Sequence, residues 1–143
     1  MQTLPRQHAL PIQTSRGLAI RMNAISGSRL AEKVADYFPY SSVRPFQDTF
    51  TNTIYEAVKA GNHVLLEGSN GLGKTVAALS ACLPIAKEKG LQILYTAKTH
   101  RQHDRVIEEL NAISKKQAVS GLSVRGRCEM CFHPFILRHA PDA

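Results

Sequence analysis

The amino-acid sequence predicts an α/β fold in which a parallel β-sheet is covered by helices. Two observations carry this prediction. From residue 43 onward, short apolar runs alternate with longer helical patterns, and a glycine-rich turn stands where one such run gives way to a helix. Strands that alternate with helices of this length are typical of parallel sheets built from right-handed crossovers. The length of 143 residues and the hydrophobic fraction of 43% fit one globular domain.

The expected elements follow one another along the chain. One face of the first helix carries four apolar residues at helical spacing: Phe46, Phe50, Ile54 and Val58. Gly61 ends this helix, and the apolar run at residues 63–67 predicts a buried strand. A helix rich in Ala and Leu follows at residues 74–89 and stops at Gly90. Downstream we expect a strand, a charged helix and a weaker strand at residues 91–96, 102–115 and 118–124.

The first 30 residues differ in composition from the rest. They contain four arginines and no acidic residue, since the first carboxylate is that of Glu32. An acid-free segment with arginines and serines is similar to an organelle transit peptide. The alternatives are a disordered extension and a start codon assigned too early. We therefore expect residues 1–30 to be a disordered or non-native leader.

The charge of the chain limits its partners. Lys and Arg outnumber Asp and Glu by 18 to 11, and the net charge of +7 favours polyanions such as nucleic acid or an anionic membrane surface. A merely basic globular protein is the alternative. No apolar stretch approaches the roughly 18 residues of a membrane span. The odd number of cysteines indicates a reducing, cytoplasmic setting, or the nucleus in a eukaryote.

A phosphate-binding loop is the most specific signal in the chain. Every fixed position of the pattern G-x-x-x-x-G-K-[ST] is satisfied by Gly68, Ser69, Asn70, Gly71, Leu72, Gly73, Lys74 and Thr75. Glycines let the backbone N–H groups curl around phosphates at the positive end of a helix. We expect Lys74 to carry catalytic charge on the β- and γ-phosphates and Thr75 to bind Mg²⁺.

The segment before the loop points to the nucleotide base. The run Arg44-Pro45-Phe46-Gln47 resembles the adenine-reading Q motif of superfamily 2 helicases. The Gln47 amide can donate and accept at once, so Gln47, with Arg44 beside it, would select ATP. The alternative for Gln47 is a solvated helix residue.

The segment after the loop resembles motif Ia of the XPD-type helicases. Residues 93–102 and the helical residues 106–110 follow that pattern, with Lys98 where arginine is typical. The resemblance implies a RecA-like ATP-binding domain and a loop that contacts the backbone of single-stranded DNA. The DNA-binding residues of this loop would be Lys98, Thr99, His100 and Gln102.

Two cysteines near the end of the chain extend the resemblance. Residues 127–134 are similar to the segment where that family places the first cysteine ligand of a four-iron, four-sulphur cluster, with Cys131 as the ligand and Cys128 as an extra cysteine. Half of a zinc site is the alternative. Cys82 is expected in the core. Because a cluster needs four ligands, it would form only in a longer parent protein.

The resemblance implies that residues 37–143 are the amino-terminal part of an ATP-binding domain, ending at the start of an iron–sulphur insertion. The parent would be an ATP-dependent DNA helicase of the DNA-repair type, with ATP, Mg²⁺ and single-stranded DNA as partners. No Asp-Glu-x-His sequence is present to hold Mg²⁺ or orient water, so we expect an inactive fragment. The alternatives are a non-catalytic nucleotide- and DNA-binding remnant and another P-loop enzyme, such as a kinase or a GTPase.

Overall fold

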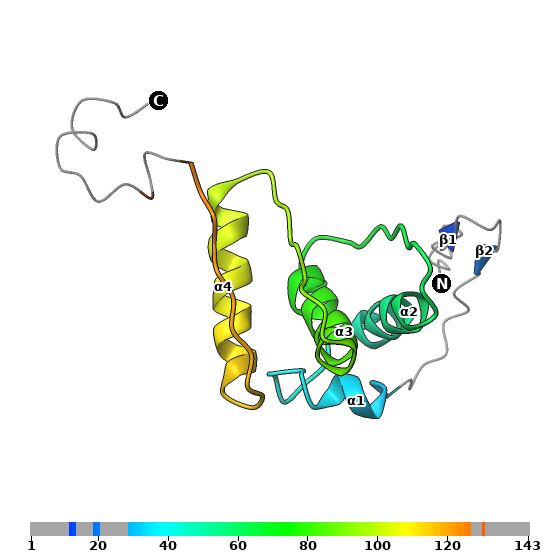
Figure 1. Ribbon diagram of the computed structural model, residues 1–143. Coiled ribbons are helices and arrows are strands. Elements are labelled where there is room, and N and C mark those ends of the chain that lie inside the picture. Colours follow the sequence, from blue (N-terminus) through cyan, green and yellow to red (C-terminus); the bar gives the residue numbers. More distant parts are fainter. Residues whose placement is uncertain (1–11, 14–18, 21–28, 127–129, 131–143) are drawn as a thin grey trace, which may run out of the picture.

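Helices dominate the computed structural model, which describes residues 12–13, 19–20, 29–126 and 130 (Figure 1). The helices in this part of the chain are α1 (Glu32–Ala35), α2 (Gln47–Lys59), α3 (Lys74–Lys89) and α4 (His100–Ser114). Two strands of two residues each, β1 (Ile12–Gln13) and β2 (Ala19–Ile20), pair antiparallel. Of the other residues of the expected leader, only Arg29 and Leu30 are described, and Leu30 packs against an apolar cluster. The rest lie outside the described part of the chain, so the leader stays a prediction.

Helix α3 lies at the centre of the structure, because it packs against α1, α2 and α4 (Figure 1). On one side Ala77, Ala81 and Ile85 follow one another at intervals of four residues and pack with Phe50 and Ile54 of α2. Residues four apart share a helix face, so these small side chains let the two helices approach closely. This contact forms the larger of the two apolar clusters.

A second apolar cluster joins α3 to α4. Leu79 of α3 packs with Tyr37 and with Ile113 of α4, and Ile113 is completely buried. The hydroxyl group of Ser80 donates a hydrogen bond to the Tyr37 carbonyl oxygen at 3.0 Å. Since α3 uses two different faces, it is apolar on more than one side, as expected for a helix inside a bundle.

The sequence predicted the three long helices correctly. The expected helix at residues 74–89 has the bounds of α3, and Gly90 caps it in the left-handed conformation with φ of 64°. The helix expected from about residue 102 begins two residues earlier, at His100. Phe46 was expected on the apolar face of the first long helix. Instead it precedes α2 with φ of 64°, and it is 63% exposed.

The predicted parallel sheet is wrong. Within residues 29–126 no residue belongs to a strand, and the three segments expected as strands run as extended loops between and beside the helices (Figure 1). A strand buried on both faces would hide its side chains, whereas Leu65 is 82% exposed and Leu94 is 90% exposed. An apolar run marks side chains suited to burial, but a strand forms only where a second strand lies within hydrogen-bonding distance. The described part of this chain is therefore helical and is not a RecA-like α/β domain.

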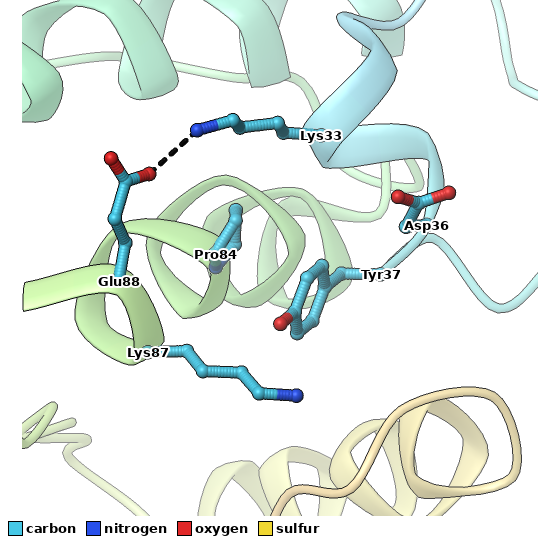
Figure 2. Close-up of a pocket in the computed structure, with 6 residues that line it drawn as sticks. All are labelled: Lys33, Asp36, Tyr37, Pro84, Lys87 and Glu88. Carbon is cyan, nitrogen blue, oxygen red and sulfur yellow. Dashed lines mark hydrogen bonds and ion pairs between the residues drawn. The ribbon is translucent and has the colours of Figure 1, made fainter. Parts of the chain in front are cut away.

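A small cavity of about 260 Å³ lies between α1 and the carboxyl-terminal half of α3. Figure 2 shows Lys33 of α1 reaching across it to Glu88 of α3, with Nζ and Oε2 2.7 Å apart. The ion pair raises the pKa of Lys33 and lowers that of Glu88. Both side chains are exposed, so the pair adds little to stability. This cavity lies away from the glycine-rich loop and plays no part in the site below.

Candidate functional site

The glycine-rich loop at residues 68–73 is shaped by two glycines in the left-handed region. Gly71 and Gly73 both have φ of 83°, a conformation that side chains disfavour. A Cβ at Gly73 would also lie 2.3 Å from Nε2 of Gln47. Between the two glycines, Leu72 is buried in the larger apolar cluster and anchors the loop. The glycine pattern of the motif is thus required by backbone geometry.

Lys74 begins α3 and its ammonium group turns back over the loop. Nζ donates to the carbonyl oxygens of Gly68 at 2.9 Å and Ser69 at 3.0 Å. The side chain is exposed, so the carbonyl contacts leave it open to an anion. An ammonium group held by neutral carbonyls gains from exchanging them for charged phosphate oxygens.

Gln47 and Arg44 hold the loop from the side of α2. Gln47 is only 2% exposed, its Oε1 accepts from the Arg44 N–H at 3.1 Å, and its Nε2 donates to the Gly73 carbonyl oxygen at 3.4 Å. The Arg44 guanidinium donates to the carbonyl oxygen of Gly71. The alternative of a solvated Gln47 is therefore wrong. These bonds connect the segment before α2 to the loop, a link that the sequence did not reveal.

A cavity of about 690 Å³ opens beside Lys74 and Thr75. Its other walls are residues 95–98 and three residues of α4: Arg101, Gln102 and Arg105. Lys74, Lys98, Arg101 and Arg105 give it four cationic side chains, and none of the described residues that line it carries a carboxylate. A cavity of this charge attracts phosphate groups. It brings two segments together that the sequence had assigned to different ligands, namely the phosphate loop and the DNA loop.

The four predicted DNA-binding residues have different roles in the structure. The Thr99 hydroxyl accepts from the Gln102 N–H at 3.4 Å, and Gln102 Oε1 accepts from the N–H groups of Lys98 and Thr99. Thr99 and Gln102 thus form a capping box that starts α4. The Lys98 ammonium group has no partner among the described residues, and the imidazole of His100 is exposed. The side chains of Lys98 and His100, the other two predicted DNA-binding residues, take no part in the capping box.

Sequence reasoning missed Arg101 and Arg105 in the cavity and the buried Glu109 behind them. Arg105 pairs with Glu109 at 2.9 Å and with Glu108 at 3.3 Å. The signal was present, because residues 101, 105 and 109 are spaced by four and share one face of a helix. The packing of α4 on α3 places this face on the same cavity as Lys74 and Thr75.

The iron–sulphur prediction falls on residues that the structure does not describe. Cys128 and Cys131 both lie outside the described residues, and within them no group of three or more His, Cys, Asp or Glu side chains could hold a metal ion. Cys82 is partly buried against the larger apolar cluster, and burial raises the pKa of its thiol. It therefore behaves as the packing residue that the sequence predicted. No helix in the described part of the chain is long and apolar enough to cross a membrane.

Comparisons with known proteins give distant relatives. No protein-family profile matches the chain, and no solved structure matches it. The chain is 25% identical over 111 residues to the transcription and DNA-repair factor IIH helicase subunit XPD of Schizosaccharomyces pombe, covering 71% of this chain and 14% of the relative. It is 26% identical over 117 residues to the Arabidopsis thaliana XPD subunit, covering 74% and 15%. A probable ATP-dependent helicase of Methanocaldococcus jannaschii is 30% identical over 89 residues, covering 62% and 14%.

The chain thus spans only about one seventh of the length of these curated relatives, since the alignments cover 14% or 15% of each. The three relatives come from a fungus, a plant and an archaeon, and all three are helicases by name. Over 62% to 74% of its length, the chain is a distant homologue of the XPD helicase subunits and of an archaeal ATP-dependent helicase.

Proposed function

We propose that residues 37–143 are the ATP-binding segment of an ATP-dependent DNA helicase. The observation that carries the proposal is the cavity beside the loop, where Lys74 and Thr75 lie with three further cationic side chains. The helicase names of the relatives support the same activity for a longer parent protein. The loop alone would be compatible with many P-loop enzymes, and the names of the relatives favour a helicase among them.

The residues of the cavity fit the triphosphate of ATP. Lys74 would exchange the carbonyl oxygens of Gly68 and Ser69 for phosphate oxygens, and the left-handed glycines leave room for the phosphates to approach the backbone. Thr75 would hold Mg²⁺ through its hydroxyl group. Bound Mg²⁺ would neutralise charge on the β- and γ-phosphates. Arg44 and Gln47, through their bonds to the carbonyl oxygens of Gly71 and Gly73, would keep the loop in the shape that accepts the phosphates.

Calorimetry with ATP and Mg²⁺ tests the phosphate site. Lys74→Ala should lower ATP affinity at least about tenfold, because a charge-assisted contact with phosphate is lost. Lys89→Ala is the matched control, since Lys89 is exposed in the last turn of the same helix, far along α3 from the loop. Equal ATP affinities of the wild-type protein and Lys74→Ala would contradict the proposal that Lys74 contacts the phosphates.

A second function is favoured by one feature of the cavity. Hydrolysis of ATP needs an acidic residue on Mg²⁺ and a residue that orients water, and no carboxylate is found among the described residues of the cavity lining. By itself the chain would then be a non-catalytic nucleotide- and DNA-binding unit. An ATPase assay with single-stranded DNA separates the two functions, since turnover that Lys74→Ala abolishes would contradict the non-catalytic one.

A further inference from the structure

The cations of the larger cavity are not equivalent. Arg105 is neutralised by Glu108 and Glu109, and Lys74 rests on two carbonyl oxygens. Lys98 and Arg101 have no side-chain partner among the described residues. Two exposed positive charges therefore face the same cavity as the phosphate loop without a carboxylate of their own.

The backbone of Arg101 belongs to the first turn of α4. It lies one turn before Arg105 on the same face of α4, and the bond between Arg105 and the buried Glu109 fixes the orientation of that face. The capping box of Thr99 and Gln102 fixes the first turn, in which Arg101 lies. A guanidinium group on such a rigid element can donate two parallel hydrogen bonds to one phosphate group.

The segment at residues 44–47, here called the Q-like segment, contacts the glycine-rich loop without lining the cavity. Gln47 and Arg44 contact the carbonyl oxygens of Gly73 and Gly71, but neither residue lines the cavity. The lysine of such a loop reaches the β- and γ-phosphates, and Lys74 lines the same cavity as Arg101. The end of the phosphate chain would then lie toward α4.

We infer that Arg101 binds the terminal phosphate of a nucleoside triphosphate held by the loop at residues 68–75. This inference rests on the proposed function. It adds a residue outside the phosphate loop that would distinguish a triphosphate from a diphosphate. Arg105 is already neutralised by Glu108 and Glu109, so its role would be to hold α4 through these ion pairs. Phosphate binding would then fall to Arg101.

The test compares the affinities for ATP and ADP, each with Mg²⁺, by calorimetry. Arg101→Ala should weaken ATP binding about tenfold and ADP binding by less than about twofold, because only the triphosphate reaches this charge. Arg101→Lys should restore part of the ATP affinity, since it keeps the charge without the planar fork. Lys115→Ala removes a charge from the other end of α4 and should change neither affinity. Inorganic tripolyphosphate should compete with ATP less well in Arg101→Ala than in the wild-type protein.

Several outcomes would overturn the inference. Equal losses for ATP and ADP would show that Arg101 acts through the general charge of the cavity. Weaker binding of an oligothymidine with unchanged ATP affinity would assign Arg101 to nucleic acid. If Lys74→Ala loses ATP binding while Arg101→Ala keeps it, this inference fails and the proposed function stands. If the wild-type protein binds no ATP, both fail.

Discussion

Tyr40 donates its phenolic hydrogen to the carboxylate of Glu109 at 2.6 Å, although the two residues are 69 positions apart in the sequence. Glu109 is 3% exposed and also forms an ion pair with Arg105. Nearby, the Lys116 ammonium group donates to the Phe38 carbonyl oxygen at 2.9 Å. Together these bonds attach the segment that carries Arg44 and Gln47 to the helix that carries Arg101. Both sides of the candidate nucleotide site are therefore connected through α4.

Tyr40→Phe should destabilise the protein by about 1 to 2 kcal/mol, because the buried Glu109 loses one of its two partners. The free energy of unfolding in urea measures the change. Tyr95→Phe is the matched control, since Tyr95 is exposed and its hydroxyl group forms no hydrogen bond within the described part of the chain. An equal effect of the two substitutions would mean that the bond to Glu109 contributes nothing.

The same bond predicts a dependence of stability on pH. The hydrogen bond to Glu109, followed by burial, raises the pKa of Tyr40 above its ordinary value of 10.0. A raised pKa in the folded state stabilises the protein fully below the unfolded-state pKa, and this stability is lost as pH rises through the folded-state pKa. Above about pH 10, the difference between wild type and Tyr40→Phe should shrink. A difference that stays constant up to pH 11 would contradict this account.

Gly73→Ala should deform the phosphate loop more than an ordinary glycine replacement does. The new Cβ would meet Gln47 Nε2 at 2.3 Å in addition to the unfavourable φ of 83°. Gly61→Ala is the matched control, with φ of 75° and nothing within 4 Å, and should cost only about 1 to 2 kcal/mol. Melting temperature and ATP affinity should both fall further for Gly73→Ala. Similar losses in the two variants would show that Gln47 moves away freely.

Asn52 anchors the backbone before α1 and should contribute to stability. Its Oδ1 accepts from the Ala31 N–H and its Nδ2 donates to the Arg29 carbonyl oxygen, both at 3.0 Å. Asn52→Ala should destabilise the protein by about 1 to 3 kcal/mol, because two backbone groups lose their partner. The exposed Asn111 of α4 provides the control substitution. Chemical denaturation would refute the anchoring role if Asn52→Ala were as stable as Asn111→Ala.

Lys98→Ala should weaken binding of single-stranded DNA about equally for all sequences and lower the salt slope by about one, because one phosphate contact is lost. The capping roles of Thr99 and Gln102 leave Lys98 as the exposed cation of this loop. Replacing Arg6 and Arg16 together should matter less. A fluorescence titration across salt concentrations gives the answer, and equal losses in both variants would indicate diffuse binding through the net charge.

The helices could be predicted because their signals are local. The apolar spacing of α2, the glycine after α3 and the start of α4 each lie within a few residues of the element that they define. Lys74, Thr75 and Lys98 were also predicted as site residues from short motifs, and the structure places all three on one cavity, while their roles stay predictions. Such patterns act within one turn of a helix or one loop, so the sequence by itself determined them.

Only the tertiary structure decided the pairings between distant segments. The runs at residues 63–67 and 91–96 have the composition of strands, but pairing depends on a neighbour elsewhere in the chain, and the described part of the chain provides none. Likewise, the composition of α4 does not tell which neighbour its charged face meets. Only the folded structure packs Ile113 against Leu79 and places Arg101 on the same cavity as Lys74. The bond between Tyr40 and Glu109 joins residues too far apart for any periodic pattern to relate. Long-range contacts arise from how whole elements bury their apolar faces, and this information is not contained in any short stretch of sequence.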